Sequence, residues 1–301
     1  MLMNIDYEYL SRIRRAVALY TNRKTSNILD GDFHSIHKGR SMEFDDLKEY
    51  NIGDDVHDID WKSSSRMGTT LVRRYVTDRR HNVMFICDCG RKMLGDTLKG
   101  ESKRELALMT FGTLAYITGR NGADFALAHP APGSMSISLF KSGAEHLEAL
   151  LYEYEKHVGE DMGLTLEEAL KNVVSVVHKK MIIVLISDME GIASVSGNVM
   201  RAVTSEHDLL AFGIEDAMLT GGDTFDNDLG RYEKRFLSFN DRLHKLELEE
   251  RNEIYGIASD NTKHSKVSLV SISSQSEIID SSIVLFERYR HGNYGYIKTT
   301  V

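Results

Sequence analysis

The stretch Asn82-Val83-Met84-Phe85-Ile86-Cys87-Asp88-Cys89-Gly90-Arg91-Lys92 decides the fold of this chain. Its first six residues form a short apolar run that ends at a carboxylate and a glycine, which is the pattern of a buried parallel strand leading into a turn. A second apolar run, Val184-Leu185-Ile186-Ser187-Asp188, has the same layout. We therefore expect two buried strands that each present an aspartate at the carboxyl end.

From residue 81 onward, short apolar runs alternate with longer segments of helical period. This alternation predicts an α/β fold with an open parallel sheet covered by helices. The expected strands are 82–88, 124–128, 136–140, 181–188, 209–214 and 266–273. The expected helices are 102–120, 144–157, 166–178, 195–206, 232–258 and 276–289.

Composition restricts the class of protein. The chain has 301 residues, of which 42% are hydrophobic and 27% charged, so we expect a globular protein and not a disordered one. A net charge of -8 disfavours nucleic acid as a partner. No apolar run approaches the roughly 20 residues of a membrane span, and no secretory signal is recognisable. Cys87 and Cys89 are expected to be reduced core thiols, and the location to be cytoplasmic.

Polar side chains follow the predicted strands at the edge where open parallel sheets bind their ligands. Asp88 and Asp188 end two strands, and Thr165 immediately precedes a helix. A purely structural interpretation is also available, because strand-end carboxylates commonly cap backbone amides. Thr165 with Glu168 three residues later equally fits a helix capping box.

The span from Arg80 resembles a von Willebrand factor type A domain, a Rossmann-like fold. Its metal-ion-dependent adhesion site uses an Asp-x-Ser-x-Ser turn, a Thr and a later Asp, which Asp88, Thr165 and Asp188 match. Gly90 and Lys92 stand at the two serine positions, and Mg²⁺ requires oxygen ligands. We expect a metal-free site in which Lys92 leans toward the two aspartates. The alternatives are weak Mg²⁺ binding at Asp88, Thr165 and Asp188, or a solvent-facing Lys92.

Upstream of residue 80, a helix of about the first twenty residues is expected, followed by an irregular stretch with short strands. That stretch resembles the domain of unknown function 58 family, which joins such an element to a type A-like domain. We accordingly expect one unit at residues 1–80 and a second at 81–301. Lys48 and His57 stand where this family usually has arginines. The residues that carry the resemblance are Lys38, Gly39, Arg40, Glu43, Tyr50, Gly53, Asp54, Asp55, Asp60, Trp61, Lys62, Arg66 and Arg73.

Two interpretations of this stretch remain open. Its carboxylates and basic side chains nearly balance, which favours a network of ion pairs and hydrogen bonds around Trp61. Alternatively, Asp54, Asp55, Asp58 and Asp60 converge on a divalent metal and make the chain a metal-dependent hydrolase.

Together the two resemblances imply a bacterial-type, non-enzymatic adaptor that needs no cofactor and works with a MoxR-type AAA+ ATPase. The expected partner-binding crevice consists of Asp88, Gly90, Lys92, Thr165 and Asp188, with Lys92 meeting an acidic residue of the partner. A purely structural scaffold is the remaining alternative.

Overall fold

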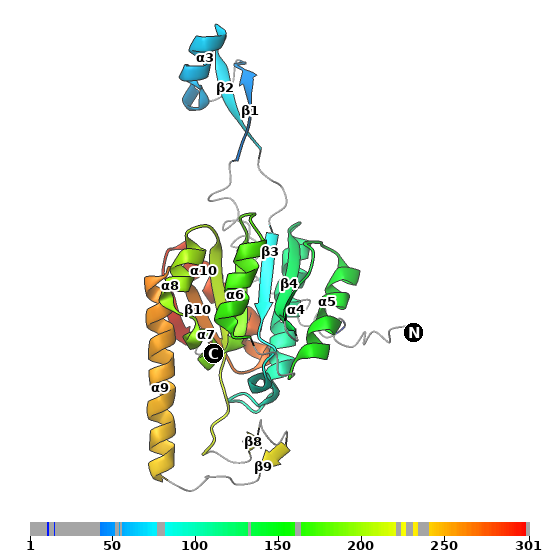
Figure 1. The fold of residues 1–301 in the computed structure, drawn as a ribbon, viewed down its shortest axis with the longest axis vertical. Helices are drawn as coiled ribbons and strands as arrows, with labels where there is room; N and C mark the ends of the chain where they lie inside the picture. The colour runs from blue at the N-terminus through cyan, green and yellow to red at the C-terminus, as the bar shows by residue number, and fades with distance from the viewer. Residues whose placement is uncertain are drawn as a thin grey trace.

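A seven-stranded sheet forms the centre of the molecule in the computed structural model (Figure 1). The structure describes residues 11, 15, 43–51, 54, 56–76, 82–131, 134–159, 164–220, 224–226, 231–233 and 241–298. In sheet order the strands are β11 (Gly295–Lys298), β10 (Ser268–Ile272), β7 (Asp208–Ile214), β6 (Ile182–Asp188), β3 (Asn82–Cys87), β4 (Asp124–Ala131) and β5 (Ser134–Ile137). All neighbours pair in parallel except the edge strand β5, which runs antiparallel to β4.

Helices cover both faces of this sheet. One face carries α4 (Lys103–Arg120), α5 (Ala144–His157) and α10 (Ile278–Arg290). The other face carries α6 (Leu166–Val176), α7 (Met189–Ser194), α8 (Gly197–Thr204) and α9 (Asp241–His264). Short 3₁₀ segments lie at η2 (Arg91–Leu94) and η3 (Gln275–Glu277).

Strand β3 shows why its sequence is continuously apolar. Val83, Phe85 and Cys87 pack on the face that carries α4, whereas Met84 and Ile86 pack on the face that carries α6. All of β3 is buried, because neither face of the sheet meets water. The predicted α/β architecture is therefore confirmed. Cys87 and Cys89 are buried free thiols, and burial raises the pKa of Cys87 well above its ordinary value.

A small element precedes the sheet in the chain. In it, β1 (Glu43–Glu49) pairs antiparallel with β2 (Leu71–Val76). The segment that connects these strands in the sequence contains η1 (Val56–Asp58) and α3 (Trp61–Met67). Figure 1 shows it beyond the end of the sheet at which β3 begins. The expected boundary at residues 80 and 81 lies outside the described residues, as does the predicted first helix apart from Ser11 and Arg15.

The structure departs from the predicted elements mainly after β6. The short helix α7 starts directly at the end of β6, where no helix was predicted. The expected helix over 232–258 instead begins at Asp241, and β8 (Thr224–Asp226) pairs with β9 (Arg231–Glu233) before it. The edge strand β11 was also missed, because four residues with mixed polarity give no periodic signal. None of the helices in the described ranges is both long and apolar enough to cross a bilayer.

Candidate functional site

The sheet reverses its strand order between β3 and β6. From β3 the chain proceeds to β4 on one side, and from β6 it proceeds to β7 on the other side. Open α/β sheets bind ligands at the carboxyl ends of the strands beside such a reversal. Asp88 directly follows β3 and Asp188 is the last residue of β6, so both aspartates lie at this position.

Asp88 uses both of its carboxylate oxygens for local hydrogen bonds. Oδ1 accepts the Gly90 N–H at 2.8 Å, and Oδ2 accepts the Ser187 hydroxyl at 2.7 Å. Burial, together with the nearby charge of Asp188, raises the pKa of Asp88 above its ordinary value. The hydroxyl of Tyr154 also donates to the Asp88 carbonyl at 2.9 Å and fixes the backbone there.

Asp188 caps the helix that follows it. Its Oδ1 accepts the Gly191 N–H at 2.7 Å, and the side chain is almost fully buried. The backbone of Gly191 lies so close that a Cβ there would overlap Ser187 Oγ and lie 3.1 and 3.2 Å from carboxylate oxygens of Asp188 and Asp88. The two aspartates therefore have the capping contacts that the purely structural interpretation predicted.

The cation next to Asp188 is Lys103, which the sequence analysis did not single out. Lys103 Nζ lies 3.4 Å from Asp188 Oδ2 and also makes an ion pair with Asp216. The Lys103 side chain is only 3% exposed. Lys103 is the first residue of α4, where the helix dipole disfavours a positive charge, so its neutralisation depends on these two carboxylates.

Asp216 lies just beyond β7 and is held in place by two other segments. The Ala217 N–H donates to the Asp96 carbonyl at 3.0 Å, and Arg251 of α9 donates to the carbonyls of Asp216 and Ala217. Burial raises the pKa of Asp216, and Lys103 only partly offsets this effect. The three neighbouring parallel strands β3, β6 and β7 are thus each followed by or end in an aspartate near their carboxyl ends.

The expectation that Lys92 leans toward the aspartates was wrong. Its ammonium makes an ion pair with Glu190 in the first turn of α7, and both side chains are about half exposed. The contact with Glu190 and the charges of Asp188 and Asp88 outweigh the effect of burial and raise the pKa of Lys92. The space beside Asp188 is taken by Lys103, and Lys92 pairs instead with the more exposed carboxylate of Glu190.

Thr165 and Gly90 have local structural contacts. Thr165 and Glu168 form the capping box of α6, in which the Thr165 Oγ1 accepts the Glu168 N–H at 3.2 Å. Gly90 contributes its N–H to Asp88 and offers no side-chain oxygen. In the described part of the chain, no hydrogen bond or ion pair joins Thr165 to Asp88 or Asp188.

This donor set does not fit the magnesium ion of an adhesion site. The two turn hydroxyls are replaced by Gly90 and Lys92, and the Lys103 ammonium lies against Asp188 where a second cation would be repelled. Across the residues that the structure describes, no three His, Cys, Asp or Glu side chains converge into a group that could hold a metal ion.

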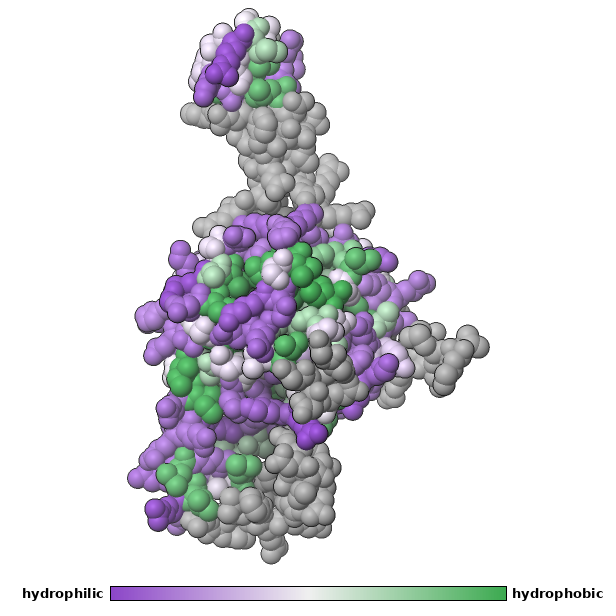
Figure 2. Space-filling model, in the orientation of Figure 1, coloured by the Kyte–Doolittle hydropathy of each residue, from purple (hydrophilic) through white to green (hydrophobic). Residues whose placement is uncertain are grey.

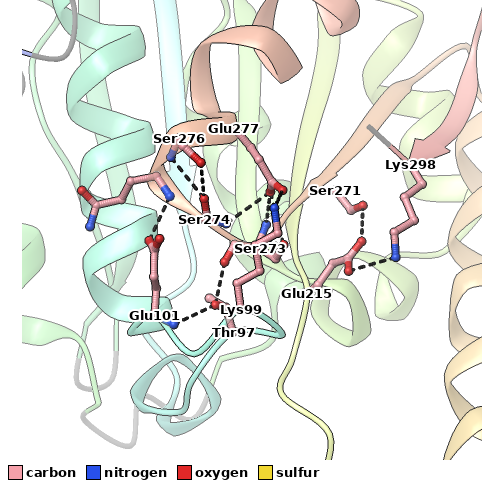
Figure 3. Close-up of polar contacts among 11 residues, drawn as sticks. Thr97, Lys99, Glu101, Glu215, Ser271, Ser273, Ser274, Ser276, Glu277 and Lys298 are labelled. Atoms are coloured by element: carbon pink, nitrogen blue, oxygen red, sulfur yellow. Dashed lines mark hydrogen bonds and ion pairs between the residues drawn. The ribbon is translucent and has the colours of Figure 1, made fainter. Parts of the chain in front are cut away.

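A second polar cluster follows β10 and consists of Ser273, Ser274 and Glu277 (Figure 3). We call it the strand-end serine cluster. Glu277 accepts the N–H groups of Ser273 and Ser274 at 2.7 and 3.2 Å and makes an ion pair with Lys99. These contacts outweigh burial and lower the pKa of Glu277. The neighbouring Glu215 accepts the Ser271 hydroxyl at 2.6 Å and pairs with Lys298 at 3.3 Å.

The strand-end serine cluster fixes the loop that leads to Lys103. The Thr97 hydroxyl donates to the Ser273 carbonyl at 2.6 Å, and the same oxygen accepts the Glu101 N–H at 3.1 Å (Figure 3). A Glu101 oxygen in turn accepts the Gln275 N–H at 2.9 Å. Ser102 then caps α4. The position of the buried lysine is thereby set by residues about 175 positions later in the chain.

Trp61 lies at the surface of the small β1–β2 element that carries the family resemblance. It begins α3 and is 68% exposed, so it is not enclosed by the described residues. Most charged side chains of the predicted network lie outside the described residues, so that network stays a prediction. Val56 and Met67 are also exposed, and Figure 2 shows hydrophobic and hydrophilic residues side by side on this element. Asp60 caps α3 by accepting the Ser63 N–H, and the Tyr50 N–H donates to the Thr70 carbonyl.

The remaining signature residues divide into two groups. Lys62 and Arg66 lie on α3 and are exposed. The structure does not describe Lys38, Gly39, Arg40, Gly53 or Asp55, nor the side chains of Glu43, His57 and Arg73.

Two of the four acidic residues proposed for hydrolysis, Asp54 and Asp60, have local partners, and Asp55 lies outside the described residues. Asp54 pairs with Lys48 at 2.6 Å and accepts the Asn51 N–H at 2.9 Å, which lowers its pKa. Asp60 serves as a helix cap, and Asp58 lies in η1. These contacts give the hydrolase alternative no support.

The strand order, the antiparallel edge strand and the aspartates at the reversal define a von Willebrand factor type A-like domain. The chain belongs to the family described as "Protein of unknown function DUF58", whose model matches residues 46–220. Both resemblances expected from the sequence are thus confirmed.

Other proteins show more distant similarity. The chain is 23% identical over 215 residues to Uncharacterized protein Mb1516 of Mycobacterium bovis and to Uncharacterized protein Rv1480 of Mycobacterium tuberculosis, covering 71% of this chain and 67% of each relative. Among solved structures, BatB from Bacteroides thetaiotaomicron has a TM-score of 0.47 at 13% identity, covering 70% of this chain and 99% of that chain. A von Willebrand factor type A protein from Catenulispora acidiphila has a TM-score of 0.39 at 10% identity, with 74% and 45% covered.

Proposed function

We propose that this chain is a non-enzymatic adaptor that binds a protein partner at its strand-end crevice without a divalent cation. The observation that carries the proposal is the ion pair of buried Lys103 with Asp188 and Asp216. In the type A resemblance a metal ion neutralises the aspartates and meets the partner. Here a lysine of the same chain supplies the positive charge, so binding has no need of the ion.

The expected surface of Asp88, Gly90, Lys92, Thr165 and Asp188 changes accordingly. The Asp188 side chain is buried, whereas the side chains of Lys92 and Glu190 are exposed at the rim of the crevice. The exposed pair offers a partner both a donor and an acceptor, and such polar contacts favour specificity over raw affinity. We propose that the partner contacts Lys92 and Glu190, and that the buried aspartates hold the surrounding backbone in place.

The resemblance to the family suggests a MoxR-type AAA+ ATPase as the partner, and a cytoplasmic location is consistent with the two free thiols. The first test is a calorimetric titration of the chain with Mg²⁺, in which we expect no stoichiometric binding. The second is binding to a nucleotide-free MoxR-type ATPase of the same organism, measured by biolayer interferometry with Mg²⁺ or with EDTA. We expect equal dissociation constants in both buffers.

A variant pair locates the contact. Lys92→Ala should weaken the complex, whereas Lys180→Ala should not. Lys180 is similarly exposed, but it pairs with Asp208 at the amino-terminal ends of β6 and β7, away from the crevice. Loss of the complex in EDTA, or Mg²⁺ uptake that Asp188→Asn abolishes, would overturn the metal-free proposal. Equal effects of the two lysine variants would remove the crevice as the binding surface.

A further inference from the structure

A pocket of about 260 Å³ opens beside the buried lysine. Its walls come from the loop before α4, the start of α7, the segment after β7 and one side of α9. Typical pockets for small-molecule ligands measure about 300–1,000 Å³, so this pocket suits a single long side chain better than a cofactor. The lining residues are Gly95, Asp96, Lys103, Met189, Glu190, Asp216, Ala217, Leu219, Glu247, Glu250, Arg251, Ile254 and Tyr255.

The charge of the pocket favours a cation. Five carboxylates and two basic groups line it, which gives a formal charge of -3. Both basic groups are already engaged, Lys103 with Asp188 and Asp216, and Arg251 with the carbonyls of Asp216 and Ala217. Glu190 is paired with Lys92, which does not line the pocket, so counting Lys92 leaves a formal charge of -2 at the pocket. This surplus of negative charge attracts a cation.

The other lining residues are apolar or aromatic. Leu219 and Ile254 offer a surface for methylene groups, and Tyr255 adds an aromatic ring. Lysine and arginine side chains bury their methylene stems on such surfaces while the charged end keeps polar partners. An aromatic ring adds attraction for a cation within about 6 Å of it.

We propose that this pocket receives a lysine or arginine side chain of the protein partner. The inference rests on the proposed function and adds the chemistry of the partner: a basic residue enters a pocket of net negative charge, with its stem against Leu219 and Ile254. Glu250, exposed on α9 at the edge of the pocket, meets the charged end.

The test uses capped single residues as probes on the full chain. N-acetyl-lysine methylamide and N-acetyl-arginine methylamide are titrated into protein with ¹³C-labelled methionine and isoleucine methyl groups, with the Met189 and Ile254 signals as readout. The matched probes are the capped forms of norleucine and glutamate. We expect saturable shifts with the basic probes, and binding at least about fivefold weaker with norleucine, in line with one favourable charge contact.

A pair of variants tests the charge contact. Glu250→Gln should weaken binding of the basic probes about threefold, a change of the size expected for an exposed ion pair. Glu253→Gln is the control, because Glu253 is exposed on the same helix but does not line the pocket. Added salt should also weaken binding.

Equal binding of norleucine and lysine, preferred binding of glutamate, or no saturable shift with any probe would each overturn the inference. The proposed function is tested separately by the Mg²⁺ titration and by the complex in EDTA. A complex that persists in EDTA while the basic probes fail would remove only the pocket assignment. Probes that bind while the complex depends on Mg²⁺ would remove only the proposed function.

Discussion

Lys103 Nζ lies 3.4 Å from Asp188 Oδ2, although 85 residues separate the two in the chain. The lysine begins the helix that follows the first buried strand, and the aspartate ends the neighbouring strand of the sheet. This pair connects the two sides of the strand reversal. It also supplies a positive charge to an edge at which the residues for a metal ion are incomplete.

Replacement of this lysine should be strongly destabilising. Lys103→Met leaves Asp188 and Asp216 without their cation, and removing one member of a buried ion pair costs about 3–5 kcal/mol. Chemical denaturation gives the free energy of unfolding. Lys103→Met combined with Asp216→Asn should recover part of the loss, because one uncompensated charge is then removed. A single variant as stable as wild type would contradict the structural role of the pair.

The same substitution should create sensitivity to divalent cations. With the ammonium removed, Asp188 and Asp216 face each other without compensation, so Mg²⁺ should raise the melting temperature of Lys103→Met by mass action. Wild type should show no such rise. The Lys103→Met, Asp216→Asn double variant should respond less than the single variant. An equal response in all three proteins would show that the ion acts elsewhere.

The close approach at Gly191 predicts a further loss of stability. A Cβ there overlaps Ser187 Oγ and crowds the carboxylates of Asp88 and Asp188, and such overpacking costs about 1–3 kcal/mol. Gly191→Ala should therefore lower the unfolding free energy by about this amount. Gly256 of α9 is the control, because a Cβ there meets no atom within 4 Å. Gly256→Ala should stabilise by about 0.5–1 kcal/mol through helix propensity.

Glu277 should make stability depend on pH in the acidic range. Its folded pKa lies below the ordinary value of 4.5, so the ionised carboxylate stabilises the fold above that value. This contribution is lost as the pH falls through the folded pKa. Glu277→Gln should cost about 1–2 kcal/mol at pH 7, and the difference from wild type should shrink below about pH 4. A difference that stays constant from pH 7 to pH 3 would contradict the assignment.

Trp61 makes one region visible to fluorescence. It is the single tryptophan of the chain and is 68% exposed, so iodide should quench most of its emission in the native protein. Unfolding of the seven-stranded sheet should change tryptophan emission little, while circular dichroism shows the full transition. A buried, poorly quenched tryptophan would place Trp61 in an interface that α3 does not have within the described residues.

Much of the sheet could be predicted from sequence because its strands are buried on both faces. Apolar runs such as 82–87 and 182–188 carry a strong signal, and their terminal aspartates mark the edge where ligands bind. Elements with little burial gave no such signal. The start of α9 was placed too early because its amino-terminal half is largely exposed and charged, so no apolar stripe marks where it begins.

The site was predicted only in part, because contacts between distant segments decide it. The choice of Lys92 rested on its place at the second serine position of the adhesion-site turn that the sequence resembles, but Lys103 is closer in space to Asp188. One signal for Lys103 was present in the sequence. A lysine at the first position of an apolar helix opposes the helix dipole, and an unfavourable charge of this kind indicates a nearby acid. Asp216 follows the apolar run that forms β7 after one intervening residue, Glu215, and it was not among the predicted site residues.

The interior position of β3, between β6 and β4, has a mechanical consequence. The small β1–β2 element enters β3 at one end, and Asp88 lies at the other end, about 20 Å away for six extended residues. Because β3 is hydrogen-bonded to β4 and β6 along its length, force applied to that element would load two parallel ladders in shear before reaching the strand-end aspartate. A motor that pulled on the amino-terminal part of this chain would therefore act first on the strand that leads to Asp88.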